Sequence, residues 1–571
     1  MTKPTSRSVA ATDDRTNNIP PFSPYILDIR SLALFRILLG LYLLYDIASH
    51  LQAGKYSIAW YTSEPQSRSI LASDDTPHKS PFHQIWFYRG SANLQIIHFT
   101  ILGLLSLAFL VGYTGQHFHN RQGKGGLLKV FLWIVLVALQ NKSIPLSDGS
   151  DAYLRHLLLW CCWLPLTEVW SIDAWSRTNL NSPKTEQSIT VKGLACLGIT
   201  LQIVLMYLGT VLHRTVDRYS WSEMHQCVWL PPKLTAVHYI MNGLFASRKH
   251  WFADLIRTTP ALSQGMTASA ILIEFVAPIL CFILGSSRYW AAFTSFQLHL
   301  GLYMTMNLPN WQFVGMISQV LWIPPHVWDR ILSQTKKHST LNNAHYKKTD
   351  GDDVQGATKS MAAAVQPSNW LSKMLQYFFF IYMIYNFTAN RGWLSKIDNG
   401  DIGEGLRISQ TWLMYETVID KAEATFLTGI TAETRERFDL HYHIRHHRQG
   451  LSRLQVNETT IVDSMTYNFP DPRWERALSQ WAYKKRDVFT GPVTRMLETL
   501  CTLVNEDQYI QQKIPFEELE LHWMYLQILP LGSDNRFHYS NKPDNVITVA
   551  CKEETSESRQ RSSSRGVDAV Q

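Results

Sequence analysis

Long apolar runs constrain the fold of this 571-residue chain more than any other feature of its sequence. The first run, DIRSLALFRILLGLYLLYDI at residues 28–47, is as long as the ~20 residues that a helix needs to cross a bilayer. We therefore interpret it as a membrane helix, which excludes a purely soluble protein. Further apolar runs predict helices at residues 94–113, 127–140, from about 151 to 166, 194–212, 266–284, 289–307, 311–323 and 370–388.

Charged residues inside these runs need a partner or a route to water, because an ionisable group within a bilayer is costly. Arg36 lies about one and a half turns from the start of the first run. Its guanidinium either reaches the head groups or faces the interior and binds a carboxylate of another helix. Glu274 lies near the centre of the run at 266–284, where it must be neutral or paired, and we expect it to bind Arg36. Asp46 and Arg155 are further intramembrane charges for which we expect a structural role.

The succession of apolar and polar stretches predicts a mainly α-helical fold. We expect a polytopic membrane helical bundle of about eight or nine spans and a smaller mixed α/β C-terminal extramembrane domain. In that domain, RFDLHYHIR at 437–445 alternates as short strands do, and WERALSQWAYKK at 474–485 is typical of an amphipathic helix. The expected organisation is a disordered N-terminal arm at 1–27, the bundle at 28–325, a disordered loop at 326–369, the last transmembrane helix at 370–388, the extramembrane domain at 389–550 and a disordered tail at 551–571.

The distribution of basic residues predicts the orientation of the bundle. Lysine and arginine are concentrated in alternate loops, which the positive-inside rule assigns to the cytosol together with the N-terminus. Nine spans then place the C-terminal domain on the opposite side, in the lumen of the endoplasmic reticulum or another endomembrane compartment. The loops concerned are 114–126, 167–193, 285–288 and 326–369.

Two features of the C-terminal domain bear on a luminal position. Asn457, in the sequon NET, is a candidate for glycosylation, whereas the sequons at Asn141 and Asn386 lie too close to the membrane to be good acceptors. Cys501 and Cys551 could pair if the domain is luminal, because an oxidising compartment permits disulfides.

No other pattern in the chain points to a specific chemistry. The net charge of +7 does not indicate nucleic acid, because the basic residues lie beside apolar runs and form no stripe. His441 and His443 would share one face of a strand, and with His446 they could bind zinc or copper. No cysteine or acid at metal-ligand spacing accompanies them, so a solvated basic strand and turn is the preferred interpretation. The residues indicate no particular cofactor.

The first run closely resembles the first helix of the horizontally transferred transmembrane (HTTM) family, to which vitamin K-dependent gamma-carboxylases belong. That helix reads Asp-Pro-x-Ser-Leu-Ala-x-Phe-Arg, then Phe-Gly and Asp-Ile. The segments 148–173 and 296–313 are similar to the family's Gly-Gly-Asp-x-Leu-Leu-Arg segment and to its helix with a histidine. The resemblance covers roughly residues 25–500 and is closer to the bacterial-type members than to the true carboxylases. Matching positions are Asp28, Ser31, Leu32, Ala33, Phe35, Arg36, Gly40, Asp46, Ile47, Asp151, Arg155, Trp170, Ser171, Asp173, Gln202, Tyr207, Trp221 and His299.

This resemblance implies a polar site between the helices, but with altered chemistry. The carboxylases carry a lysine base after the tyrosine of the fifth run, where this chain has His213 and Arg214. Arginine stays protonated, whereas a histidine can act as a base near neutral pH. Asp151 stands where the carboxylases have a second histidine, as in the bacterial-type proteins, and His299 is retained. The candidate catalytic residues are therefore His213, Arg214, His299 and Asp151, and glutamate carboxylation is not expected.

Two classes of function remain open at this point. The first is a membrane enzyme with an intramembrane polar site that acts on an amphipathic quinone, lipid or peptide. The second is a non-catalytic membrane protein that binds or moves a lipid or a protein partner, in which the same polar groups only hold helices together. Polar residues inside membranes are more often functional, which favours the first class.

Overall fold

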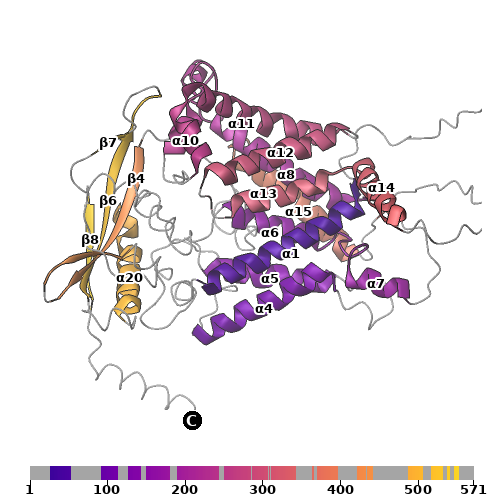
Figure 1. Ribbon diagram of the computed structural model, residues 1–571, viewed down its shortest axis with the longest axis horizontal. Helices are drawn as coiled ribbons and strands as arrows, with labels where there is room; N and C mark the ends of the chain where they lie inside the picture. Colours follow the sequence, from indigo (N-terminus) through magenta and orange to yellow (C-terminus); the bar gives the residue numbers. More distant parts are fainter. Residues whose placement is uncertain are drawn as a thin grey trace, which may run out of the picture.

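The computed structural model shows a mainly helical protein with a smaller sheet region (Figure 1). Four helices are long and apolar enough to cross a membrane: Ile29–Gln52, Asn93–Val111, Leu194–Arg214 and Pro260–Cys281. The structure describes residues 26–52, 92–113, 126–142, 149–179, 190–242, 250–283, 286–306, 308, 310–342, 363–364, 370–395, 421–432, 434–440, 486–505, 516–531, 537–539 and 545–551.

The helices pack side by side around one large apolar core. The sequence predicts the nine main helices of the bundle, with ends that differ by up to six residues. The main helices are α1 (Ile29–Gln52), α4 (Ala92–Val111), α5 (Gly126–Lys142), α6 (Gly149–Cys161), α8 (Leu194–Arg214), α11 (Pro260–Cys281), α12 (Ser286–Thr305), α13 (Trp311–Gln319) and α15 (Trp370–Ala389). The other helices up to residue 389 are α7 (Ile172–Asn179), η4 (Met224–Gln226), α9 (Ala236–Asn242), α10 (Trp251–Thr258), η5 (Val320–Trp322) and α14 (Pro325–Asn342).

Asp28 caps the N-terminus of helix α1. The Asp28 carboxylate accepts the backbone N–H of Arg30 at 2.7 Å, which satisfies one of the free donors at the helix start. The Arg30 guanidinium binds the same carboxylate and also reaches Asp329 of α14 at 2.6 Å. The start of α1 is thereby joined to α14, at the right in Figure 1.

A small sheet lies where α1 begins. Strand β1 (Ile26–Asp28) is antiparallel to β2 (Thr190–Lys192), and β2 is parallel to β3 (Ala363–Ala364). The structure here differs from one sequence-based boundary, because Ile26 and Leu27, expected in the disordered arm at 1–27, belong to a strand.

The expected disordered loop at 326–369 likewise contains regular structure, namely α14 and β3. The stretch is poor in apolar residues, yet α14 buries Trp328, whose indole N–H donates to the Ser31 hydroxyl of α1 at 2.7 Å. One buried aromatic residue on an otherwise polar helix is a weak signal in a hydropathy profile.

The C-terminal part forms a five-stranded antiparallel sheet with a helix beside it (Figure 1). The strand order is β5-β4-β6-β7, and β8 also pairs with β6. This part is a mixed α/β region, as the sequence predicts for 389–550. Its elements are β4 (Lys421–Thr431), β5 (Arg437–Asp439), α20 (Arg486–Asn505), β6 (Phe516–Ile528), β7 (Phe537–Tyr539) and β8 (Asn545–Ala550).

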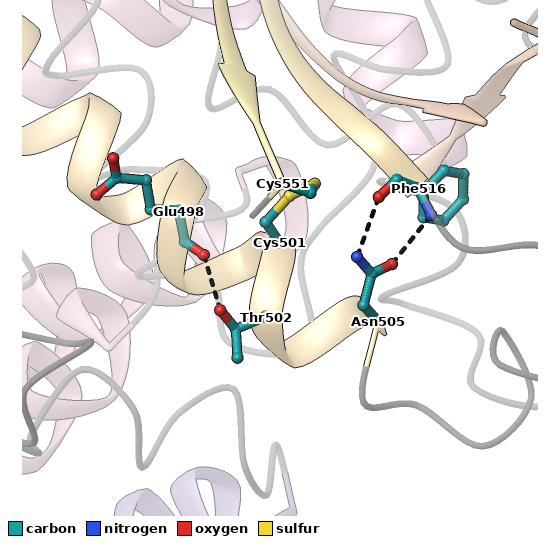
Figure 2. Close-up of a disulfide and its surroundings, with 6 residues drawn as sticks. All are labelled: Glu498, Cys501, Thr502, Asn505, Phe516 and Cys551. Carbon is teal, nitrogen blue, oxygen red and sulfur yellow. Dashed lines mark hydrogen bonds between the residues drawn. A yellow bond between two sulfur atoms is a disulfide. The ribbon is translucent and has the colours of Figure 1, made fainter. Parts of the chain in front are cut away.

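A disulfide between Cys501 and Cys551 ties α20 to the end of β8 (Figure 2). The Asn505 amide, one turn further along α20, exchanges two hydrogen bonds of 3.0 Å with the backbone of Phe516, where β6 begins. Cys551, which the sequence analysis assigns to the disordered tail, is therefore part of the folded domain.

The sheet region contacts the helical bundle at one end. His238 of α9 lies with its Nε2 2.9 Å from the carbonyl oxygen of Leu529, just after β6. In Figure 1 the sheet and α20 lie at the end of the bundle opposite α14 and the start of α1. The chain therefore enters the bundle at one end and continues into the sheet region at the other.

Candidate functional site

Three buried side chains from α8, α12 and α13 form a hydrogen-bonded chain inside the bundle. The Tyr207 hydroxyl lies 2.6 Å from Nε2 of His299, and the Gln319 amide donates to the Tyr207 oxygen at 2.9 Å. Each of the three residues is at most 3 % exposed. Because the Tyr207 oxygen accepts from Gln319, its own proton can be donated to His299. The pair holds an exchangeable proton in an apolar interior.

An ion pair lies two helical turns from Tyr207 on the same face of α8. Tyr207 and Arg214 are seven residues apart, which returns the helix to nearly the same direction. Arg214 Nη1 donates to Glu274 Oε2 of α11 at 2.6 Å, and both side chains are buried. The guanidinium also lies 4.3 Å from the ring centre of Trp229, within the range of a cation–π contact. Glu274 is near enough to Tyr207 for an electrostatic interaction.

The position of the His299 ring depends on a glycine. A Cβ atom added at Gly315 of α13 would overlap the imidazole, with the Cε1 and Nδ1 edge nearest to it. Among the described residues, Nδ1 of His299 has no hydrogen-bond partner. Helix α13 can thus approach α12 at this point only because residue 315 has no side chain.

Aromatic side chains enclose this polar group. The Trp311 ring lies 6.4 Å from the His299 ring and 5.8 Å from the Tyr153 ring, measured between centres. Tyr153 of α6 is fully buried and interacts with Ser318. Side chains of α6, α8, α12 and α13 therefore meet at one place.

Of the four candidate catalytic residues, His299 is a member of this hydrogen-bonded chain, and Arg214 lies two helical turns from Tyr207. His213 faces another direction from Arg214, because adjacent helix residues differ by about 100°. Its Nδ1 lies 3.7 Å from Asp217, which also binds Arg391 beyond the end of α15. His213 is thus part of an ionic group at the end of α8.

Asp151, the fourth candidate, belongs to a separate buried network. The Gln140 amide donates to Asp151 at 3.1 Å, and Arg155 donates to the side-chain amide oxygen Oε1 of Gln140 at 2.6 Å. Gln140 thereby links an acid and a base four residues apart on α6. The structure describes no contact between this network and His299.

The expected pairing of Arg36 with Glu274 is wrong. Arg36 is only 1 % exposed, and it donates to the backbone oxygens of Leu166 at 3.1 Å and Trp170. Its guanidinium is also close to Gly112, whose φ of +68° suits a residue without a side chain. Arg36 therefore anchors the segment after α6, and Arg214 is the partner of Glu274.

Asp46, expected to be structural, joins two helices. Its carboxylate accepts the Asn310 amide at 3.0 Å, at the start of α13, and lies 4.0 Å from His50 on the next turn of α1. Asn386, in one of the sequons, is buried and accepts a hydrogen bond from Asn390, which agrees with its dismissal as an acceptor. His441, His443, His446, Asn457 and the predicted helix at 474–485 lie outside the described residues.

The sequence analysis did not select Tyr207, Tyr153 or Gln319 as site residues. Tyr207 appears there only as a position that matches the family pattern. A glutamine such as Gln319 near the end of an apolar run is a usable signal, because it needs hydrogen-bond partners when buried. Among the described residues, no group of three or more histidine, cysteine, aspartate or glutamate side chains could hold a metal ion.

Comparisons with protein-family models, curated proteins and solved structures find no match to this chain. A buried tyrosine–histidine pair can donate or accept a proton, and a nearby arginine can hold an anion, which together are the parts of a general acid–base site.

Proposed function

We propose that the chain is a multi-pass membrane protein of HTTM type that acts as an enzyme on an amphipathic quinone, lipid or peptide. The Tyr207–His299 pair would transfer a proton to or from the substrate. The observation that carries this proposal is the Gln319 hydrogen bond to the Tyr207 oxygen, which directs the hydroxyl proton toward His299 Nε2. A purely structural hydroxyl could be satisfied by one backbone carbonyl, as Thr210 and Ser106 are.

The ion pair would contribute electrostatics to the same site. Arg214 lies on the face of α8 that carries Tyr207 and would stabilise an anionic intermediate, while Glu274 keeps the cation in place. His213, at the end of α8 beside Asp217, would then pass protons between this site and the aqueous phase. His213 and Arg214 stand where the carboxylases carry their lysine base, so vitamin K-driven glutamate carboxylation is not part of this proposal.

The membrane arrangement that goes with this function has nine spans. Besides the four helices of sufficient length and apolarity, α12 and α15 expose large apolar side chains, among them Phe293, Tyr303, Met374 and Ile381. Water-exposed positions rarely carry such residues in series, whereas a lipid-facing surface does. The full set of spans would be α1, α4, α5, α6, α8, α11, α12, α13 and α15.

The side of the membrane on which the sheet region lies follows from the side of the N-terminus and the number of spans. With the N-terminus in the cytosol, an odd number of spans puts the sheet region in the lumen of the endoplasmic reticulum or another endomembrane compartment. The Cys501–Cys551 disulfide supports this side, because disulfides persist in oxidising compartments and are rare in the cytosol.

A non-catalytic role is the second candidate, and one observation favours it. The His299 ring packs against Gly315 so closely that no Cβ would fit, which is how a helix-packing histidine behaves. In that case the protein binds or moves a lipid or a protein partner, and the polar network only joins helices.

Membranes from cells that produce the wild type or single variants discriminate the two candidates. Tyr207→Phe and His299→Gln each remove one member of the pair, while Tyr303→Phe and His225→Gln make the same changes at exposed positions. Lipid and quinone extracts would be compared by untargeted mass spectrometry at equal amounts of folded protein. An enzyme should yield a product that the wild type and both control variants make.

The pair variants should lose that product by about 10²–10⁴-fold, the usual contribution of a general acid or base. Extracts that do not differ between the wild type, Tyr207→Phe and His299→Gln would contradict catalysis at this pair and support the binding role. Carboxylation of a glutamate peptide with vitamin K hydroquinone would show that this reaction does not need the lysine base that the carboxylases carry.

A further inference from the structure

Arg288 is a buried cation whose hydrogen bonds are incomplete. It is the third residue of α12 and is 4 % exposed. One terminal nitrogen, Nη1, donates to the carbonyl oxygen of Ile26 in β1 at 2.7 Å. The other donors, Nε and Nη2, are buried and have no hydrogen-bond partner among the described residues. Arginine remains charged in proteins, so these donors cannot be satisfied by loss of the proton.

Arg288 differs in this respect from the other buried arginines that the structure describes. Each of those contacts an acidic side chain, lies close to one or reaches one through Gln140. Among the described residues, the ionisable side chains with an electrostatic effect on Arg288 are two thiols, Cys196 and Cys281, and neither is an acid that could neutralise it. The acids near the others are Asp28 and Asp329 for Arg30, Asp173 for Arg36, Asp151 for Arg155, Glu274 for Arg214 and Asp254 for Arg257.

The two free donors lie on the same edge of the guanidinium. The N–H bonds of Nε and Nη2 run parallel, and this edge binds two oxygens of a carboxylate or a phosphate side by side. A buried charge without a counter-ion costs several kcal/mol, whereas a paired and hydrogen-bonded charge does not carry that full penalty. The free edge of Arg288 therefore has the shape and the charge to bind an oxyanion.

The surroundings add positive potential at the same end of the bundle. Cys196, one of the two neighbouring thiols, is the third residue of α8, and the start of α8 has no side-chain cap. The unbonded N–H groups and the helix dipole make such a start attractive to anions. β1 and β2 lie at this end, next to the beginning of α1.

We propose that the Nε–Nη2 edge of Arg288 binds a phosphate-type oxyanion, supplied either by the head group of an anionic lipid or by free phosphate. The site is independent of the Tyr207–His299 pair. Its lipid form rests on the proposed membrane embedding, which would put the start of α12 at the level of the cytosolic head groups. The cytosolic leaflet is rich in anionic lipids, and basic residues at its surface attract them.

The test uses the purified full chain in detergent and three substitutions. Arg288→Gln removes the charge and the fork, and Arg288→Lys keeps the charge without the fork. Arg330→Gln is the matched control, because Arg330 lies on α14 at the same end of the bundle and is exposed. Thermal unfolding is followed with added dioctanoyl phosphatidic acid, dioctanoyl phosphatidylcholine or inorganic phosphate at constant ionic strength.

The wild type and Arg330→Gln should be stabilised by phosphatidic acid or by inorganic phosphate, and not by phosphatidylcholine. Stabilisation by phosphatidic acid alone assigns the site to a lipid head group, and stabilisation by inorganic phosphate assigns it to the free ion. Arg288→Gln should lose the effect, and Arg288→Lys should need about tenfold more of the anion, because lysine cannot bind two oxygens with one planar edge.

The proposal fails if Arg288→Gln responds to the anions as the wild type does. It also fails if none of the anions stabilises the wild type. The Nε–Nη2 edge of Arg288 would then be paired with an acidic side chain of the protein itself. Should Arg288→Gln not fold, the comparison of Arg288→Lys with the wild type decides, and equal anion requirements overturn the proposal.

Discussion

Arg214 and Glu274 form a buried ion pair between α8 and α11, with 2.6 Å between Arg214 Nη1 and Glu274 Oε2. The pair lies on the side of α8 that also carries Tyr207, so one helix face holds both the hydroxyl of the proposed proton-transfer pair and the cation. The Arg214 side chain is 2 % exposed and the Glu274 side chain 9 %. Each buried charge is therefore compensated by the other, and this mutual compensation can be measured with single and double substitutions.

Removing one member of this pair should cost more stability than removing both. Glu274→Leu leaves Arg214 buried without its acid, and a loss of about 3–5 kcal/mol in the free energy of unfolding is expected. The double variant Arg214→Met with Glu274→Leu should lose markedly less, because no charge remains uncompensated. Unfolding of the purified protein in detergent measures both, with Arg330→Met as an exposed control that should change little.

If the losses of the two single variants simply add in the double variant, the two charges do not interact and the pairing is wrong.

For Glu274, the sequence alone predicts that a partner is needed but not which residue the partner is. Its place near the centre of an apolar run indicates that it must be paired or neutral, and this is what the structure shows. The partner could not be read from the sequence, because apolar runs identify helices and not which helices are neighbours. Arg214 could be recognised as the partner only from the packing of α8 against α11, which is why the expected pairing with Arg36 is wrong.

Gly315→Ala should disturb the His299 site, whereas Gly301→Ala should not. The added methyl at Gly315 overlaps the imidazole, and forced overpacking of this kind costs about 1–3 kcal/mol. Nothing lies within 4 Å of a Cβ placed at Gly301 of α12, so alanine there should stabilise the helix by up to about 1 kcal/mol. Thermal unfolding in detergent gives the comparison.

Equal effects of the two alanines would mean that α13 does not pack on His299 as described.

The short polar helices and strands are the part of the fold that the sequence reveals least. α14 falls in a stretch poor in apolar residues, and the pattern that marks it is one buried indole, Trp328. α20 was not anticipated either, because its first half contains Gly491 and Pro492, which usually signal a loop. The second half of α20 is joined to the end of β8 by the Cys501–Cys551 bond, a contact that no local sequence pattern shows.

The disulfide should be present in the protein as purified from cells. Cys501 and Cys551 should resist alkylation without reductant, while a single change, Cys501→Ser, should expose the thiol of Cys551 to the reagent. The bond closes a loop with a sequence separation of 50. Loss of a crosslink of this size removes roughly 4 kcal/mol in a chain-entropy model. Peptide mapping by mass spectrometry measures the first effect, and unfolding of the sheet region measures the second.

Complete alkylation of both cysteines in the non-reduced wild type would contradict the bond. As a control, Cys162→Ser should leave the mapping of Cys501 and Cys551 unchanged.

The sheet region should lose stability in acid because of His522. Burial lowers the pKa of His522 below its usual value, against the opposing effect of the neighbouring Glu520 carboxylate, whose oxygen lies 3.0 Å from Nε2. The unfolded chain then binds the proton more readily than the folded one. The stabilisation is complete above the usual histidine pKa of about 6.5 and is lost as the pH falls through the lowered pKa of the folded state.

Hydrogen exchange of the β6 amides, corrected for intrinsic rates, should show the loss of stability as the pH falls. In His522→Gln the stability should depend less on pH. His225→Gln, at an exposed histidine, should leave the decline intact. A pH profile that is unchanged by His522→Gln would assign the acid sensitivity to another group.

The most direct test of this account is the side of the membrane on which each end of the chain lies, because the nine spans, the buried site and the disulfide all depend on it. Tags at the N-terminus and the C-terminus are followed while intact microsomes are treated with protease. We predict that the N-terminal tag is digested from the cytosolic side and the C-terminal tag is protected until detergent is added. Digestion of both tags, or protection of both, would mean an even number of spans and would contradict the account.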